Sequence, residues 1–390
     1  MRDVFVIGIG QTPVSQDSRQ RGRHLAAKAL RDALEHAGVE DDRLGALYVG
    51  NMTAGILGRQ QQLGGLVADY AGLSGIEAMT VEAACASGAA AARMGYLMVA
   101  GGIHDVVAIC GVERMTHVDK TTVTEALSTA ADWELEGSRG ESFLSLNATL
   151  MRAYMDRFGA SADDFGHFAV NAHKNAVTNP NALFHKRIDL EDYRSSRTII
   201  DPIRLFDVSP VCNGAAAIVL ASGKAAAELR GGRLPAIEIA GSAAATAPLA
   251  LARRSDILRL SAVESATQQL FEHARVTHDD IDFYELHDAY TIMSVLSLES
   301  AGFTPAGSAP CFGIEGRIAL DGDLPVATMG GLKARGHPVG ATGVYQFVEA
   351  YLQLAGEAGR NQVSNAELGL VQNIGGTAST VINHLLRRVA

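Results

Sequence analysis

The most constraining feature of this chain is an internal duplication. Residues 23–51 and residues 260–288 align without a gap, and each block reads as a helix, a tight acidic turn and a short strand. A polar residue closes each strand, Asn51 in the first block and Asp288 in the second. A supersecondary unit that recurs in this way predicts one fold written twice in the same chain.

The repeat continues beyond these blocks. Small-residue runs at 85–89 and 337–341 fall in equivalent places, and a long apolar helix is expected after each. Strands are expected at 4–9, 106–110, 216–221, 368–373 and 380–385. Strands that alternate with helices indicate an α/β fold with a largely parallel sheet and helix-covered faces. Packing of the two halves would bring both runs to their shared axis, at strand C-terminal ends where ligands usually bind.

The repeat also sets the domain boundaries. We assign residues 1–230 to the first half and 233–390 to the second, with the Gly-Gly pair at 231–232 as the linker. Residues 114–200 interrupt the repeat and are richer in charge. They are expected to form an inserted loop domain, a cap over the site.

Charge and cysteine usage exclude several classes of protein. The formal net charge of −10 argues against nucleic-acid binding as the main role. The four cysteines show no zinc-ligand spacing and are too few for a disulfide scaffold, so we expect no metal and a reducing, cytoplasmic location. No signal peptide is expected, and no apolar stretch reaches membrane-spanning length without glycine or charge.

Cys85 is the candidate nucleophile. It lies in a run of small residues before an apolar helix, and a helix N-terminus lowers the pKa of a thiol. Its N–H could also serve as an oxyanion donor. The alternative is a buried cysteine that acts as a small apolar residue. The equivalent run in the second half carries His337, which favours the nucleophile. Cys110 is expected in the core, and Cys212 and Cys311 are weaker candidates.

Two histidines are candidate acid–base groups. His337 precedes Pro338 at a helix start and could take the Cys85 proton, then polarise a thioester oxygen. The alternative is an N-cap histidine without chemistry. His287 ends a strand and could donate a hydrogen bond to a substrate oxygen, unless it is purely structural. Tyr290 could act as a secondary acid, although packing is the simpler interpretation.

Two further groups of residues are candidates for supporting roles. Asn373 leads into Gly375 and Gly376 after an apolar strand, and bare glycine N–H groups there could form an oxyanion hole. The alternative is a tight turn that needs positive φ. Basic residues of the inserted segment could meet a phosphate-bearing ligand, but a solvated surface is the usual alternative. They are His173, Lys174, His185, Lys186 and Arg187.

Together these residues resemble the thiolase superfamily over nearly the whole chain. Cys85 matches its nucleophile, and the Gly-His-Pro-Val-Gly-Ala-Thr-Gly run at 336–343 matches its most specific signature. Residues 209–217 look like a motif that leads into a strand, with Asn213 where an aspartate is usual. Residues 111–115 look like the stretch that enters its loop domain.

The resemblance implies a fold, a chemistry and partners. The fold is a five-layer αβαβα sandwich of two pseudo-symmetric βαβαβαββ halves, plus a loop domain that binds coenzyme A. The chemistry is acyl transfer through a cysteine thioester, with coenzyme A as part of the substrate and no other cofactor. A homodimer formed through strands of the first half, or a tetramer, is also implied.

The chain departs from most thiolases at the second catalytic thiol. Relatives place that cysteine in a Cys-x-Gly motif, where this chain has Asn373, or in the His-Asp-Cys-Phe motif of the sterol-carrier-protein type, where this chain has Ala289. The sterol-carrier-protein type is the more similar. Forming or breaking a carbon–carbon bond needs a base for an α-carbon proton. That work falls to His287 or His337, or the reaction does not require it.

Three hypotheses follow. The first is an acyl-CoA acyltransferase of the acetyl-CoA acetyltransferase kind, acting in lipid metabolism on short acyl groups. The second is a retro-aldol lyase on a β-hydroxyacyl-CoA, with Tyr290 or His287 as base. The third is a non-catalytic subunit that channels acyl-CoA to a small OB-fold, zinc-ribbon partner. Retention of Cys85 together with His337 argues against the third, since packing alone does not require that pair.

Overall fold

Two sheets of matching strand order form the centre of the protein in the computed structural model, which describes residues 1–229 and 237–389. The strands join edge to edge in one order of nine, β3-β2-β4-β7-β1-β8-β11-β10-β9, in which β3 to β1 form the sheet of the first half and β8 to β9 the sheet of the second half. Their strands are β1 (Val4–Gln11), β2 (Ala46–Gly50), β3 (Glu77–Val81), β4 (Val106–Arg114), β7 (Asn213–Ser222), β8 (Ile237–Thr246), β9 (Phe283–Glu285), β10 (Leu368–Gly375) and β11 (Thr380–Arg388). A bridge between Tyr284 and Val326 supplies the counterpart of β3. The duplication is therefore present in the topology.

The pairing directions correct one expectation. β2 runs parallel to β3 and β4, and β9 runs parallel to β10, but the other strand pairs are antiparallel. The prediction of a largely parallel sheet is therefore wrong. Helices cover both faces of the sheets, so the antiparallel strands also carry continuous apolar runs. Such runs usually indicate parallel strands, which is why the sequence was misleading here. A single residue pair, Phe5 with Glu238, joins the two sheets.

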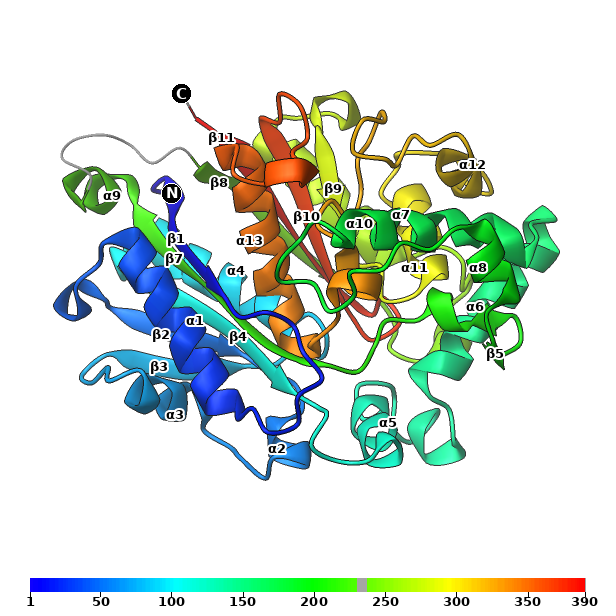
Figure 1. The fold of residues 1–390 in the computed structure, drawn as a ribbon. Helices are drawn as coiled ribbons and strands as arrows, with labels where there is room; N and C mark the ends of the chain where they lie inside the picture. The colour runs from blue at the N-terminus through cyan, green and yellow to red at the C-terminus, as the bar shows by residue number, and fades with distance from the viewer. Residues whose placement is uncertain (230–236, 390) are drawn as a thin grey trace.

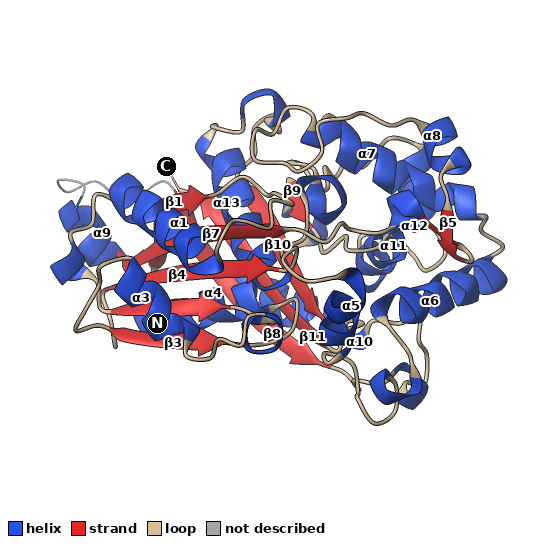
Figure 2. Ribbon diagram, turned by 60° about the horizontal axis from the view of Figure 1, so that its bottom comes forward, coloured by secondary structure: helices blue, strands red, loops and turns tan. Residues whose placement is uncertain are grey.

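Alternating side chains divide the sheets into layers. In β4, Val106 and Ala108 pack with one set of helices, whereas Val107 and Ile109 pack with another. The outer helices of the first sheet are α1 (Gly22–Ala37) and α3 (Leu63–Tyr70), the shared middle helices are α4 (Ser87–Ala100) and α13 (Thr342–Ala355), and α10 (Ser261–Ala274) covers the second sheet. Figures 1 and 2 show these five layers. No helix in the described ranges is long and apolar enough to span a membrane.

The segment between β4 and β7 forms a helical region beside the second sheet (Figure 1). It contains α5 (Lys120–Ser128), α6 (Phe143–Phe158), α7 (Gly166–Ala176), α8 (Leu190–Ser195) and the small strands β5 (Thr198–Ile200) and β6 (Ile203–Arg204). Its helices α6 and α7 pack on α11 (Thr291–Ser300), and α7 also packs on α12 (Ala309–Ile314). The remaining helices are α2 (Ala54–Leu57) and α9 (Gly223–Leu229). The proposed linker at 231–232 lies outside the described residues.

Glycines allow the first turns of α4 and α13 to touch. A Cβ atom on Gly343 would lie 2.4 Å from the backbone nitrogen of Ala89, and one on Gly88 would lie 2.9 Å from the carbonyl oxygen of Gly340. No other residue tolerates such an approach of two backbones. The N-terminal ends of the two equivalent helices therefore meet at the centre of the molecule.

This contact predicts opposite effects for one substitution at two places. Gly343→Ala should destabilise the protein by about 1–3 kcal/mol or more, because the added methyl group overlaps backbone that cannot move. Gly65→Ala should stabilise α3 by about 0.5–1 kcal/mol, since the nearest atoms, on Gln62, are 3.8 Å from its Cβ position. Urea denaturation of both variants measures the two signs. Equal effects would contradict the packing described here.

Candidate active site

Cys85 follows a strained turn at the end of β3. Ala84, just before it, has φ of 53°, in the left-handed region that disfavours a side chain. The Ser87 hydroxyl holds this turn, accepting from the Ala83 N–H at 3.0 Å and donating to the Ala84 carbonyl at 2.6 Å. Gly375 of the second half packs on the turn so closely that a Cβ there would lie 2.5 Å from the Ala83 oxygen. The duplication thus places the end of β10 against the cysteine turn.

The free thiol of Cys85 is not pre-ionised. Burial raises its pKa to about 12, and the nearby Glu113 carboxylate adds to the rise. The side chain contacts an apolar cluster that includes Leu57, Met115 and Val339. The expectation that a helix start lowers this pKa is therefore wrong, because α4 begins two residues later and desolvation outweighs the helix end. Thiolate formation at this site needs a base.

The two candidate histidines come from separate loops and touch each other. The ring centroids of His287 and His337 are 5.1 Å apart, with the rings nearly perpendicular. His287 Nδ1 lies 3.0 Å from Asn373 Nδ2, and His337 Nδ1 lies 2.7 Å from Thr342 Oγ1. Asn373 in turn lies against α13, with its Oδ1 2.5 Å from where a Cβ on Gly343 would be. Asn373 therefore links His287 to the central helix contact.

Both histidines are neutral in the folded protein. Burial lowers the pKa of His287 to about 3. Burial also places the pKa of His337 well below its usual value, and the positive charges that His287 and Arg335 can carry add to that effect. Each neutral ring has one N–H donor and one lone pair, so the partner of Nδ1 decides what Nε2 can do.

Two buried ion pairs, which sequence reasoning missed, fix the loops that carry these histidines. Lys333 Nζ lies 3.1 Å from Asp288 Oδ2, directly after His287 in the chain. Arg335 Nε lies 2.8 Å from Glu349 Oε1 of α13. Both cations belong to a single turn of π-helix, Gly331–Arg335, that precedes His337. The sequence did contain a signal for these ion pairs, since Lys333 and Arg335 are the two cations in an otherwise small and apolar glycine loop. Buried charges need partners of opposite charge.

The remaining candidates divide into two groups. Tyr290, at the start of α11, has a raised pKa because of burial and because of the charge that Cys85 can carry. Gly376 has φ of 64° directly after β10, as the tight-turn interpretation requires. Its neighbour Thr377 accepts a hydrogen bond from Arg254 at 2.6 Å through the backbone oxygen.

The basic candidates lie on the surface of the inserted region. Lys174, Lys186 and Arg187 are exposed, and none of them forms an ion pair within the described chain. His173 is buried instead, with its Nδ1 3.1 Å from the backbone oxygen of Lys186. Helix α7, which carries Lys174, packs on the π-helical turn before His337. These bases therefore stand on the outside of the loop that supports the site.

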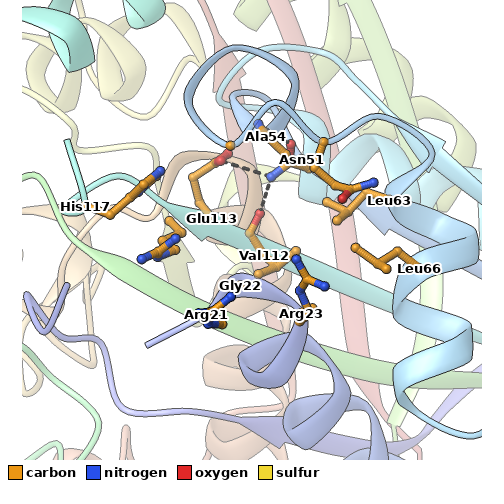
Figure 3. Close-up of a pocket in the computed structure, with 13 residues that line it drawn as sticks. Arg21, Gly22, Arg23, Asn51, Ala54, Leu63, Leu66, Val112, Glu113 and His117 are labelled. Carbon is orange, nitrogen blue, oxygen red and sulfur yellow. Dashed lines mark hydrogen bonds between the residues drawn. The ribbon is translucent and has the colours of Figure 1, made fainter. Parts of the chain in front are cut away.

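A cavity of about 100 Å³ lies between the start of α1 and the end of β4 (Figure 3). Asn51 and Glu113 form part of its wall, and the hydrogen bond between them, 2.9 Å long, is one of the dashed lines in the figure. Arg21 and Arg114 line the same cavity, whereas neither Cys85 nor the two histidines do. The cavity is therefore separate from the candidate site.

The buried neutral histidines predict how stability depends on pH. The pKa of His384 is also lowered by burial, to about 3, so below about pH 6.5 each of these histidines binds more protons in the unfolded chain than in the folded one. The stability that the three neutral rings contribute should therefore fall as the pH falls below 6.5. His384→Leu, away from the site, should reduce this slope by about 1.4 kcal/mol per pH unit. Urea denaturation between pH 5 and 7.5 measures both slopes, and identical slopes would contradict the burial of a neutral ring.

Comparison with known proteins agrees with this architecture. The family model for the N-terminal domain of thiolase matches residues 4–224, and that for the thiolase C-terminal domain-like family matches residues 243–388. An acetyl-CoA acetyltransferase of Methanothermobacter thermautotrophicus is 42% identical over 100% of both chains. Sterol carrier protein 2 of Oryctolagus cuniculus is 28% identical over 97% of this chain and 71% of its own length.

A solved structure is similar over the same extent. The Ltp2-ChsH2(DUF35) aldolase superposes with a TM-score of 0.85 at 25% identity, covering 99% of this chain and 98% of the other. Together, the two family models cover both duplicated halves of the chain. This chain belongs to the thiolase family.

Proposed function

We propose that this protein is an acyl-CoA acyltransferase of the thiolase type, which carries the acyl group as a thioester on Cys85. The observation that supports this most directly is that Gly375 of the second half packs on the Cys85 turn where the starts of α4 and α13 meet, while His287 and His337 of that half are in ring contact. A full-length relative at 42% identity carries the name acetyl-CoA acetyltransferase, which supports a short acyl group. Coenzyme A would be part of the substrate, with no further cofactor.

His337 is the proposed base. Its Nδ1 faces the Thr342 hydroxyl, and that hydroxyl donates its proton to the Pro338 carbonyl at 3.2 Å. The hydroxyl oxygen therefore accepts from Nδ1–H, and the lone pair remains on Nε2. A neutral Nε2 lone pair is what deprotonation of a thiol with a raised pKa requires.

His287 is the proposed oxyanion donor. In the amide orientation of the structure, Asn373 Nδ2 donates to His287 Nδ1, so the proton of this neutral ring sits on Nε2. An N–H held there by burial can stabilise negative charge on a thioester oxygen. The N–H groups of Gly375 and Gly376, beside the cysteine turn, are the proposed second set of donors. The two histidines would thus have complementary roles in spite of their contact.

The acylation step is then balanced. His337 takes the thiol proton as the Cys85 sulfur attacks the thioester carbonyl, and the carbon–sulfur bond to coenzyme A breaks. The departing coenzyme A thiolate receives the proton from the His337 imidazolium. Lys174, Lys186 and Arg187 are the proposed contacts for coenzyme A phosphates, since they are exposed cations beside the loop of His337.

Acylation of Cys85 gives the main test. Incubation with acetyl-CoA should add one acetyl group to the protein, and peptide mapping should place it on Cys85. Cys85→Ala should abolish the adduct, whereas Cys311→Ala, which alters an exposed cysteine, should keep it. The measurement is intact-protein mass spectrometry over a panel of CoA thioesters. No adduct on the wild-type protein with any thioester would count decisively against the proposal.

The role of His287 gives a second test. Asn373→Asp replaces the amide donor with a carboxylate, which favours a proton on His287 Nδ1 and removes it from Nε2. The acylation rate should fall by about 10²–10³-fold, as for loss of one oxyanion donor. Single-turnover acylation with acetyl-CoA measures this. Asn383→Asp, another buried asparagine in the second sheet, should leave the rate near wild type. An unchanged rate in Asn373→Asp would remove His287 from this role.

A lyase that performs a retro-aldol cleavage of a β-hydroxyacyl-CoA is the second candidate. It is favoured by the aldolase named in the similar structure and by the proximity of Tyr290 to Cys85. This reaction needs a base but no acyl-cysteine. Cys85→Ala would then retain cleavage and Tyr290→Phe would lose it, the reverse of the pattern expected for acyl transfer.

Partners of this chain form the last part of the proposal. The name of the similar aldolase structure includes a second component, ChsH2(DUF35). This supports the proposal that this chain also has a partner, a small OB-fold, zinc-ribbon protein that binds acyl-CoA. A homodimer formed through the first sheet is proposed as well. Affinity purification of the tagged protein, followed by native mass spectrometry, distinguishes the two assemblies. A catalytically inactive protein found only with such a partner would favour the channelling hypothesis.

A further inference from the structure

Glu113 is a buried carboxylate at the seam between the two halves. It ends the run of buried residues in β4 and is 1% exposed. Its Oε1 accepts from Asn51 Nδ2 at 2.9 Å and from the Thr53 hydroxyl at 2.6 Å. Its Oε2 accepts from the N–H groups of Met52 at 3.0 Å and Gly340 at 3.1 Å. One side chain therefore satisfies donors from both halves of the chain.

The identity of these donors explains why a carboxylate is needed. Three of them are backbone N–H groups, on Met52, Thr53 and Gly340. Each buried N–H left without a partner would destabilise the folded protein. Both oxygens of an ionised carboxylate accept hydrogen bonds, so Glu113 can accept from every one of these groups. A glutamine at this position would place its NH₂ group against some of them, and two donors cannot bond to each other. Burial raises the pKa of Glu113 and these donors act against that rise, so the geometry is that of a carboxylate acceptor.

The contact with Gly340 reaches the catalytic loop. Gly340 follows His337 by three residues, with the stiff Pro338 between them. A Cβ on Gly340 would lie 2.6 Å from Asn51 Cα and 2.8 Å from Glu113 Oε2, so this loop is pressed against the first half. A shift of the Glu113 carboxylate would therefore be transmitted to His337.

Glu113 also lies near the sulfur, since its charge contributes to the raised pKa of Cys85. We infer that Glu113 is a positioning residue of the site, which holds the His337 loop of the second half and the 51–53 turn of the first half in register beside Cys85. This inference rests on the proposed function, because the register matters only if Cys85 and His337 act together. Glu113 touches no reacting atom in this role.

Two substitutions separate the effect of the Glu113 charge from the effect of its side-chain length. Glu113→Gln keeps the length and removes the charge, so the pH at which iodoacetamide begins to alkylate Cys85 should be lower than in the wild type. Its kcat for acyl transfer should fall by about 10²-fold with a KM within a few-fold, as expected when a catalytic group moves by about 1 Å. Glu113→Asp keeps the charge but is too short to hold all the donors. Its kcat should also fall, while the alkylation profile stays in place.

Glu299→Gln is the matched control. Glu299 also accepts two backbone N–H groups, on Gly307 and Ala309, but it lies at the far end of α11. This variant should lose stability without a change in kcat or in the alkylation profile of Cys85. Alkylation is followed at the Cys85 peptide by mass spectrometry, since the chain has four cysteines.

Each outcome is decisive. A folded Glu113→Gln protein with wild-type kcat, or with an unshifted alkylation profile, would overturn the inference. If Glu113→Gln does not fold, a wild-type kcat in Glu113→Asp would overturn it as well. The alkylation experiment uses no acyl-CoA, so it still reports on Glu113 if the wild-type protein forms no acyl adduct. That second result would refute the proposed function instead.

Discussion

The close contact between the first turns of α4 and α13 is the constraint on which the rest of the structure depends. Two helix ends can touch backbone to backbone only where side chains are absent, and Gly88, Gly340 and Gly343 meet that condition. With the helices so close, the turn before α4 and the loop before α13 are held at the same point. The buried carboxylate of Glu113 then holds Gly340 in the loop before α13, and the amide of Asn373 holds His287 beside the same helix start.

The sequence carried more of the fold than of the site. The duplication, the strands around 106–110 and 368–373, and the family followed from patterns local to each segment. The direction of strand pairing could not be predicted in this way. β7 and β11 are buried on both faces, and a strand buried on both faces has the same apolar composition whether its neighbours are parallel or antiparallel.

The chemistry of individual side chains was the least predictable part. The pKa of Cys85 depends on Leu57, Val339 and Glu113, which are far from it in sequence and reach it only through the fold. The hydrogen-bond partner of His287 likewise comes from β10, whereas that of His337 is Thr342, only five residues further along the chain. Local motifs can nominate such residues. The proton position on the His287 ring, however, is determined by a tertiary contact.

The equivalence of the two halves has a consequence for how such a site can arise. Two identical copies related by symmetry would present the same side chain at both helix starts, either two sulfurs or two imidazoles. A thiol facing a proton acceptor requires the copies to differ at that position. Because both copies are parts of one chain, each can change without altering its counterpart. The two halves can therefore carry different catalytic groups, a proton donor in one and an acceptor in the other, because they are joined in a single chain.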